Sequence, residues 1–333
     1  REKRYLPDFM TVQYHPTALK LLIAQGLVRM VKAGHQQEDY SETARYALTD
    51  AAYTQLPVSS LTDRDFNIGK RDEVIRLRDI EGRLARYSDT QETNAMRSNL
   101  HRLNDLLEGT DIALTRQANP LTDFDDKYSG ERTDLYRIFN KGSFQQGGRF
   151  YGGWWQHARR SLRPYITING EPTVEADFKG LHPAILFAKS KLEIPLDPYS
   201  LVPGVADSEA LREHAKTTFL ALLNADRGTS EPRNFDTAAF GITAEAFRRR
   251  VKGAFPMLPG VFGTGIGRYL QYEDSVMAER VMLHFADKNV PVLPVHDSFI
   301  IAAEHMDELV RVMQSVFYDR YGQMPKITLK ASA

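Results

Sequence analysis

Residues 290–303 hold two short apolar runs on either side of the tripeptide His296-Asp297-Ser298. Two apolar runs joined by a tight turn predict a β-hairpin that buries its strands and presents the turn residues. Asp297 would then stand at the tip of a rigid hairpin, where a carboxylate can bind a metal ion without being buried unpaired. The alternative is an ordinary turn aspartate, because Asp is a favoured turn residue.

A second hairpin is predicted around Asn169-Gly170, which separates two runs of alternating polarity. The second strand of this hairpin ends at Asp177, and an apolar stretch of helical character follows at residues 180–188. Two carboxylates that are far apart in sequence therefore each stand at the end of a strand. This arrangement suits a two-metal site, in which paired Mg²⁺ ions bridge an attacking oxygen and the phosphates of a nucleotide.

Residues 211–224 predict a helix that carries cations on one face. Arg212, Lys216, Leu220 and Asn224 recur every four residues, so their side chains share a slowly drifting stripe. The two cations could contact phosphates, and Asn224 would lie two turns further on, beside the base. A solvated charged face is the alternative. The order of carboxylate strand, cationic helix and His-Asp hairpin favours the phosphate-binding interpretation.

The same order resembles the family A nucleic-acid polymerases, the group that contains DNA polymerase I and the single-subunit phage and mitochondrial RNA polymerases. Residues 177–182 (Asp-Phe-Lys-Gly-Leu-His) resemble motif A, and residues 296–299 (His-Asp-Ser-Phe) resemble motif C. Motif B is matched by the spacing Arg212-x3-Lys216-x7-Asn224. The resemblance covers about residues 145–320. Smaller similarities are Gly148-Arg149 for a Gly-Arg pair that contacts the minor groove, Asp197-Pro198-Tyr199 for the opening of the fingers, and Gln271 for a minor-groove Gln.

Four positions depart from the family pattern. Ser298 stands where the DNA polymerases have Glu, as in the phage RNA polymerases, and Asn224-Ala225 replace an aromatic residue followed by Gly. His182 replaces a Glu of the DNA polymerases or a Gly of the RNA polymerases. A bulky residue there would collide with a ribose 2′-hydroxyl, so His182 favours deoxynucleotides. Motif A also resembles that of the family B polymerases, but the motif B spacing and the His-Asp pair favour family A.

The resemblance implies an α/β (α+β) fold: a right-hand palm with an antiparallel sheet, inserted helical fingers and a helical thumb-like region. It also implies a role for each site residue. Asp177, Asp297 and the backbone carbonyl of Phe178 would bind two Mg²⁺ ions, for which Mn²⁺ could substitute. Lys216 and Arg212 would bind the phosphates, His182 would gate the sugar, and Asn224 and Tyr199 would contact the nucleotide. Arg149, Gln271 and His296 would position the DNA primer-template, with His296 also in the catalytic group.

The expected organisation has five regions. Residues 1–58 suggest a winged helix, since a helix stopped by Gly26 precedes two apolar runs and an intervening polar stretch, although any helix followed by a hairpin gives the same pattern. Residues 59–140 follow as a helical thumb-like region, with a charged linker at residues 59–71; a simple helical packing domain is equally compatible. The remaining regions are a first palm segment (141–196), the fingers (197–270) and a second palm segment (271–333). The apolar residues expected at helical spacing in the thumb-like region are Val74, Leu77, Ile80, Leu84, Met96, Leu100, Leu103 and Leu107.

Composition narrows the class of protein. The 333 residues include no Cys, which excludes disulfides and thiolate metal sites. There is no apolar run of transmembrane length and no secretory signal, so a soluble, cytoplasmic protein without a membrane partner is expected. The sequence begins at Arg1 without Met, which suggests a fragment. The formal net charge of zero is not typical of a nucleic-acid-binding domain, although Arg159-Arg160, Arg163 and residues 248–252 could line a basic cleft.

These observations predict a template-directed nucleotidyltransferase that extends a primer 3′ end with dNTPs. Residues before 140 lack local motifs with the carboxylates of a proofreading exonuclease, so a DNA polymerase without that activity is expected. One alternative is an RNA polymerase or primase-like enzyme. Another is a metal-dependent nuclease that uses Asp177, Asp297 and His296. A non-catalytic nucleic-acid-binding module is the third, but a binding cleft gains nothing from placing acids beside phosphates.

Overall fold

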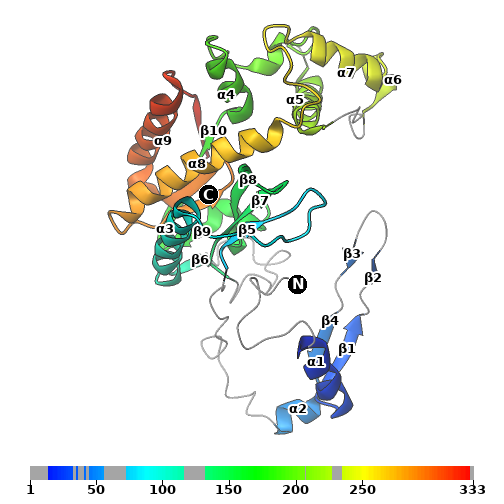
Figure 1. Cartoon of the computed structure of the whole chain (residues 1–333), viewed down its shortest axis with the longest axis vertical. Coiled ribbons are helices and arrows are strands. Elements are labelled where there is room, and N and C mark those ends of the chain that lie inside the picture. The colour runs from blue at the N-terminus through cyan, green and yellow to red at the C-terminus, as the bar shows by residue number, and fades with distance from the viewer. Residues whose placement is uncertain are drawn as a thin grey trace. The chain divides into compact units, whose positions relative to one another are not determined.

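The computed structural model divides the chain into two units, Arg1–Glu73 and Val74–Ala333. It describes residues 14–32, 35–36, 41–42, 45–55, 73–115, 132–206, 208–226 and 235–330 (Figure 1). The described residues contain helices and mainly antiparallel sheets, which confirms a mixed α/β fold. No helix in these ranges combines the length and the apolar character needed to cross a membrane.

The first unit is a helix followed by a hairpin. Helix α1 ends before Gly26, whose φ of +69° is in the left-handed region that favours glycine. Strands β1 and β4 pair antiparallel with Val28 opposite Leu48, as the two apolar runs predicted. The winged-helix assignment stays a prediction, and the linker at residues 59–71 lies outside the described residues. The elements are α1 (Tyr14–Ala24), β1 (Val28–Lys32), β2 (His35–Gln36), β3 (Ser41–Glu42), β4 (Arg45–Leu48) and α2 (Asp50–Gln55).

The second unit begins with a strand where a helix was expected. The helical interpretation of residues 74–84 is wrong, because β5 (Ile75–Leu77) pairs in parallel with β7 (Tyr136–Asn140). Its apolar residues alternate with Arg76 at the period of a strand, which a search for helical spacing overlooks. The later part of the pattern is confirmed by α3 (Gln91–Glu108), which buries Met96, Leu100, Leu103 and Leu107 and begins with a capping box from Thr90.

The main sheet contains both predicted hairpins. Its strand order is β11-β12-β10-β9-β6, and β13 also pairs with β10. At the first hairpin, Asn169 and Gly170 have φ values of +53° and +82°, as a type I′ turn requires. At the second, residues 296–297 join β11 to β12. The strands are β6 (Ile112–Leu114), β9 (Ile166–Ile168), β10 (Glu171–Phe178), β11 (Leu293–Val295), β12 (Ser298–Ala302) and β13 (Ile327–Lys330).

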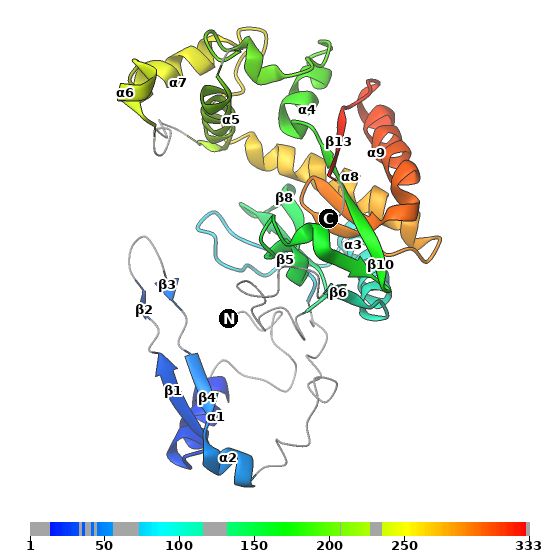
Figure 2. The same ribbon diagram turned by 180° about the vertical axis from the view of Figure 1, so that it is seen from behind.

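The central strand β10 has an apolar face and a polar face. Ala176 and Phe178 face the core, where Phe178 packs against Phe317 of α9 (Met306–Tyr321), with ring centroids 6.3 Å apart. Glu175 and Asp177 alternate with them and lie on the other face. The pleat therefore directs the carboxylates of this strand away from the face on which Phe178 meets Phe317. The view from behind shows β10 as a long strand that runs past β13, with α9 next to β13 (Figure 2).

Helices lie between β10 and β11 in the sequence and pack around an aromatic core that includes Phe219, Phe247 and Phe255. The predicted helix at residues 211–224 is confirmed by α5. Whether these helices are fingers stays a prediction. The elements of this stretch are α4 (Leu181–Lys189), η7 (Pro198–Leu201), α5 (Glu209–Asn224), α6 (Thr237–Phe240), α7 (Ala244–Gly253) and α8 (Gly267–Ala286). The remaining elements of the second unit lie outside this stretch. They are β8 (Ser143–Tyr151), which pairs with β7, and the 3₁₀ turns η5 (Trp154–Gln156), η6 (Arg163–Tyr165) and η8 (Ala303–His305).

Candidate active site

The sheet register brings the two predicted aspartates together. Asp177 lies opposite Ser298, and the backbone N–H of Phe178 donates to the carbonyl of Asp297 over 3.2 Å. Burial raises the pKa of Asp177 to about 6, and the charge of Asp297 adds to this shift. Asp177 of β10 and Asp297 of the β11–β12 turn therefore share one end of the sheet, where the charge of Asp297 opposes ionisation of Asp177.

The donor set at this edge fits a hard divalent cation. Carboxylate and carbonyl oxygens are the ligands that Mg²⁺ prefers. A bound cation would also offset the repulsion from Asp297, which adds to the effect of burial on the pKa of Asp177. In the described part of the chain, no group of three or more His, Asp or Glu side chains has the arrangement of a metal site. The two aspartates would thus need further oxygens from the backbone, water or a substrate, which is usual for Mg²⁺.

A lysine that the sequence did not indicate lies against the first aspartate. Lys330 Nζ is 2.7 Å from Glu175 Oε1 and 3.5 Å from Asp177 Oδ2. Glu175 also accepts a 2.8 Å hydrogen bond from Ser298 Oγ, and Arg163 approaches it within 3.7 Å. Burial acts to raise the pKa of Glu175, but hydrogen bonds from Lys330 and Ser298 overcome this and lower it. Glu175 is therefore an ionised carboxylate with two hydrogen-bond donors, Lys330 and Ser298, and the Arg163 guanidinium nearby.

Glu175 and Lys330 also line a hollow on the polar face of the sheet. Its volume is about 270 Å³, and η6 and the turn before it form the other wall with Arg160 and Arg163. Arg163 Nε is buried without a hydrogen-bond partner. Arg160 and Arg163 thus lie together at this hollow, whereas Arg159 and residues 248–252 do not line it, and the basic cleft stays a prediction.

His296 occupies the hairpin turn with a φ of +61°, a left-handed conformation that is uncommon for a residue with a Cβ. Its ring packs edge-on against Tyr151, with centroids 5.7 Å apart, and its Nδ1 is buried without a hydrogen-bond partner. Burial lowers the pKa of His296, and the charge of Arg149 acts in the same direction. The imidazole is therefore neutral at pH 7 and lies directly beside Asp297.

Arg149 connects the aspartates to His182. Its Nε donates to Asp274 Oδ2 over 2.6 Å, and its Nη2 lies 3.3 Å from His182 Nε2. Burial raises the pKa of Asp274, an effect that Arg149 opposes and Asp297 reinforces. The preceding Gly148 is required, because a Cβ there would lie 2.5 Å from the Phe139 ring. Asp274 was not expected from the sequence, although it follows Gln271 by three residues and so lies on a nearby face of α8.

His182 is buried at the start of α4, with 8% of its surface exposed. Burial and the charge of Arg149 lower its pKa to about 3, so the imidazole is neutral. Because Arg149 donates toward Nε2, the proton of the neutral ring belongs on Nδ1, which is buried without a hydrogen-bond partner. A buried N–H donor without a partner is costly unless a ligand satisfies it.

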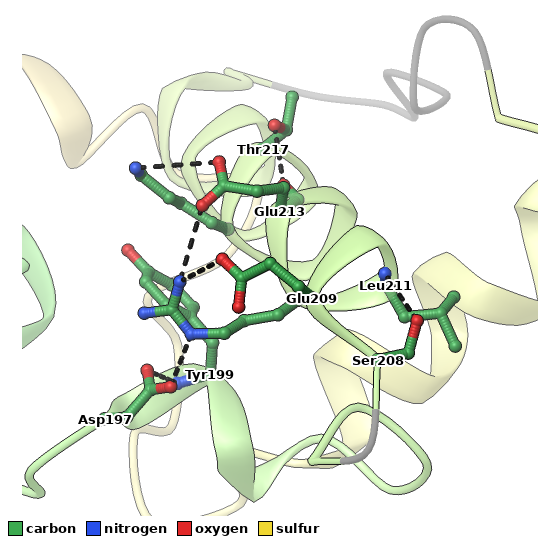
Figure 3. A network of polar contacts seen from close by, with 9 residues as sticks. Asp197, Tyr199, Ser208, Glu209, Leu211, Glu213 and Thr217 are labelled. Carbon is green, nitrogen blue, oxygen red and sulfur yellow. Dashed lines mark hydrogen bonds and ion pairs between the residues drawn. The ribbon is translucent and has the colours of Figure 1, made fainter.

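The cationic stripe of α5 lies in a network of carboxylates (Figure 3). Arg212 Nε is 2.6 Å from Asp197 Oδ2, and its Nη1 is 3.5 Å from Glu209 and 3.4 Å from Glu213. Lys216 Nζ lies 3.8 Å from Glu213 Oε2. The two predicted phosphate-binding cations are therefore on one face, as expected, and each is paired with a carboxylate of this chain.

Tyr199 connects this network to the aromatic core around Phe219. Its ring is buried against Phe219, with centroids 5.9 Å apart, and the Arg212 guanidinium lies 5.8 Å from its centre. Burial raises the pKa of Tyr199, and the charges of Asp197 and Asp297 act in the same direction. The Tyr199 ring thus packs against Phe219 and also contacts the Arg212 guanidinium.

Asn224 and Gln271 lie at the join between α5 and α8. The Asn224 amide donates to the Leu220 carbonyl over 2.8 Å, and its Oδ1 would overlap with a Cβ at Gly267. Asn224 thus packs against the first residue of α8, and Gln271 is half-buried one turn further along that helix. The contacts of these two residues do not test their expected roles beside the base and the template.

Sequence reasoning missed three charged residues at this site: Glu175, Lys330 and Asp274. A signal existed for Glu175, because it precedes Asp177 by two residues and strand alternation places both on one face. Lys330 had no local signal, because only the pairing of β13 with β10 brings it there. Asp274 resembles any other polar residue of an amphipathic helix.

Comparison with known proteins gives little. No protein-family model matches the chain, and no curated protein sequence does. A solved structure, the POL domain of Pol1 from M. smegmatis in complex with DNA primer-template and dNTP, is similar with a TM-score of 0.40 and 12% sequence identity. The match covers 72% of this chain and 51% of that one, so it spans about half of that structure. A likeness of this degree assigns neither a family nor an activity.

Proposed function

We propose that the chain is a template-directed nucleotidyltransferase that extends the 3′ end of a DNA primer with dNTPs. The observation that carries the proposal is the pairing of β10 with β12, which sets Asp177 beside Asp297. The sequence resemblance supports it, because the three motifs that suggested a family A polymerase include both aspartates, the paired cations of α5 and the His-Asp turn.

Asp177, Asp297 and the backbone carbonyl of Phe178 would hold two Mg²⁺ ions, for which Mn²⁺ can substitute. When bound, such ions lower the pKa of an attacking hydroxyl and neutralise charge on a triphosphate. The role of the chain itself is to keep the two carboxylates in register. The backbone hydrogen bond between Phe178 and Asp297 does this without relying on a flexible side chain.

The nucleotide would lie between the aspartates and α5. Lys216 is the more available phosphate ligand, because its side chain is 46% exposed and its contact with Glu213 is long. Arg212 would stabilise charge on the departing pyrophosphate. Tyr199 and Asn224 would face the sugar and base, and the buried Nδ1–H of His182 would bound the sugar on the side of its 2′ position.

Primer and template would be positioned by Arg149, Gln271 and His296. Arg149 is held by Asp274 and lies next to His182, so a guanidinium is fixed near the site where the primer end must lie. His296 adds a neutral imidazole beside Asp297. Both groups are mostly buried, which lets them fix an orientation at small entropic cost.

A primer-extension assay tests the proposal. A labelled primer on a DNA template is supplied with Mg²⁺ and either dNTPs or NTPs in parallel. We expect extension with dNTPs, and a loss of at least about 1,000-fold in Asp177→Asn and Asp297→Asn, which corresponds to about 4 kcal/mol of transition-state stabilisation. Affinity for the primer-template should change little, since a removed acid cannot weaken attraction to phosphate.

The matched control is Asp319→Asn, an exposed aspartate of α9 that pairs with Arg280. This variant should extend primers at the parental rate. Degradation of the labelled strand in place of extension would favour the nuclease, and extension with NTPs alone would favour the RNA polymerase. Appreciable extension by either site variant would contradict the assignment of the aspartates.

A further inference from the structure

We propose that Lys330 and Glu175 form a built-in counter-ion pair that sets the divalent-cation affinity of the Asp177–Asp297 site. This inference rests on the proposed function, because it takes the two aspartates as the metal ligands. It concerns two residues outside the motifs that suggested the polymerase, and it assigns them opposite effects on metal binding.

Lys330 is placed by the sheet. In the register of β13 with β10, Lys330 lies directly opposite Glu175, and Thr328 lies opposite Asp177. Cross-strand partners present their side chains on the same face of a sheet, so Lys330 shares the polar face with both carboxylates. Its Nζ is 2.7 Å from Glu175 and 3.5 Å from Asp177, and the side chain is only 27% exposed. The ammonium is thus fixed close to a proposed metal ligand.

The position of Lys330 makes it a competitor for a cation. A divalent ion that binds Asp177 must approach the same carboxylate that the ammonium already faces, and two positive charges a few ångströms apart repel each other. Because the site is partly removed from water, screening by solvent is weaker there than on an open surface. Lys330 therefore lowers metal affinity while the substrates are absent.

Glu175 limits this competition. The shorter of the two lysine contacts is with Glu175, whose carboxylate is itself held by Ser298 Oγ at 2.8 Å. Arg163 lies further away, at 3.7 Å. Glu175 thus draws Lys330 off Asp177 and adds a negative charge near the metal site. Its removal would leave the ammonium free to pair fully with Asp177.

The test measures Mn²⁺ binding directly on the full chain, by electron paramagnetic resonance of free Mn²⁺, without primer or nucleotide. Lys330→Met should tighten Mn²⁺ binding about tenfold, equivalent to about 1.4 kcal/mol. Glu175→Gln should weaken it at least about fivefold. Lys330→Arg keeps the charge and should stay within about threefold of the parent.

The matched control is Lys288→Met, which changes net charge equally but removes a lysine that pairs with Glu308, where α8 has ended and α9 begins. It should leave Mn²⁺ affinity unchanged. Circular-dichroism melting of every variant separates lost folding from lost binding.

The decisive result is that Lys330→Met tightens Mn²⁺ binding while Glu175→Gln weakens it. A merely structural pair would weaken Mn²⁺ binding in both variants, and that outcome, or an unchanged affinity in Lys330→Met, overturns the inference. Asp177→Asn tells the two proposals apart. If it abolishes Mn²⁺ binding while Lys330→Met has no effect, only the counter-ion inference fails. If Mn²⁺ binding does not depend on Asp177, the proposed metal site fails as well.

Discussion

The two halves of the candidate site are built with opposite charge and on different elements. In the acid half, Lys330 contacts Glu175 and Asp177 on the paired strands, and Asp297 lies in the turn next to them. In the cation half, carboxylates surround Arg212 and Lys216 on a helix. Each half is thus partly neutralised by the chain itself before any substrate binds.

The halves differ in how firmly their charges are held. Asp177 is 31% exposed and Lys330 27%, and backbone pairing fixes both strands. Glu213 is 54% exposed, and its contacts with Arg212 and Lys216 are 3.4 Å and 3.8 Å. Exposed ion pairs contribute about 0–1 kcal/mol, whereas partly buried charges interact more strongly. The acid half is preorganised at an energetic cost. In the cation half, Lys216 can exchange its exposed partner readily, whereas Arg212 is held by Asp197 at 2.6 Å.

The variant Lys216→Ala, in the cation half, should have the largest effect on nucleotide incorporation. If the cation half binds the triphosphate, this variant should lower kcat/KM for the nucleotide about 100-fold, equivalent to about 2.7 kcal/mol, with little effect on primer-template affinity. Steady-state incorporation and equilibrium DNA binding without nucleotide check it. The control Arg280→Ala removes an exposed cation of α8 that pairs with Asp319. Weaker DNA binding, with a salt dependence reduced by about one contact, would instead assign α5 to a DNA groove.

A smaller effect is expected from His182→Gly, which removes the imidazole that lies next to Arg149. The imidazole has enough bulk to exclude a 2′-hydroxyl, so the parent should prefer dNTPs and the variant should accept NTPs at least about tenfold better relative to dNTPs. Competition assays with mixed nucleotides measure the ratio. An unchanged ratio, or a parent that uses both sugars equally, would remove His182 from the gate position.

The cost of preorganisation in the acid half predicts a pH-dependent stability. Burial and Asp297 raise the pKa of Asp177 from 3.8 to about 6, so the folded chain binds this proton more tightly than the unfolded chain does. Stability is therefore lost as the pH rises through this window, and the full penalty applies above it. Asp177→Asn should raise the free energy of unfolding at about pH 7.5 in EDTA by about 1–2 kcal/mol, allowing for solvent screening. Urea unfolding measures this gain in the free energy of unfolding, which should shrink toward about pH 4. An equal gain at both pH values would show that the raised pKa of Asp177 is not its cause.

The smallest effect should come from Glu213→Gln, which removes a carboxylate that competes with phosphate for Lys216. We expect Mg²⁺-tripolyphosphate to bind about threefold more tightly, as the loss of an exposed partner allows. Competition against a labelled nucleotide measures it, and Glu245→Gln on α7 serves as the control. Weaker polyphosphate binding would mean that Glu213 orients the cations and does not oppose the ligand.

Local signals in the sequence predicted the features of the site that depend on turns and periodicity. Asn169-Gly170 specified a hairpin because a type I′ turn needs two positive φ values, and the stripe on α5 followed from a spacing of four. The positions of Asp177 and Asp297 at strand ends followed from these elements. Their proximity is a property of the β10–β12 register, which the motif order indicated only through resemblance.

The features that were missed depend on pairing between distant segments. Nothing in the sequence near Lys330 indicates that β13 lies beside β10, and a single buried aspartate on α8 is not distinguished from its polar neighbours. The error at Ile75–Leu77 has the same origin, because only the partner strand β7 decides between a short strand and a turn of helix.

The placement of Lys330 has a consequence for how the molecule reaches its working form. Lys330 and Glu175 are 155 residues apart, so the counter-ion pair closes only after β10 has met strands made much later in synthesis. Contacts of such high sequence separation form slowly, because loop-closure entropy must be overcome first. The hairpin at Asn169 can form early, but the neutralising lysine arrives late. Until it does, the newly made carboxylates of β10 face solvent without their counter-charge, and a nascent chain would pass through a stage in which its acids attract cations more strongly than those of the finished protein.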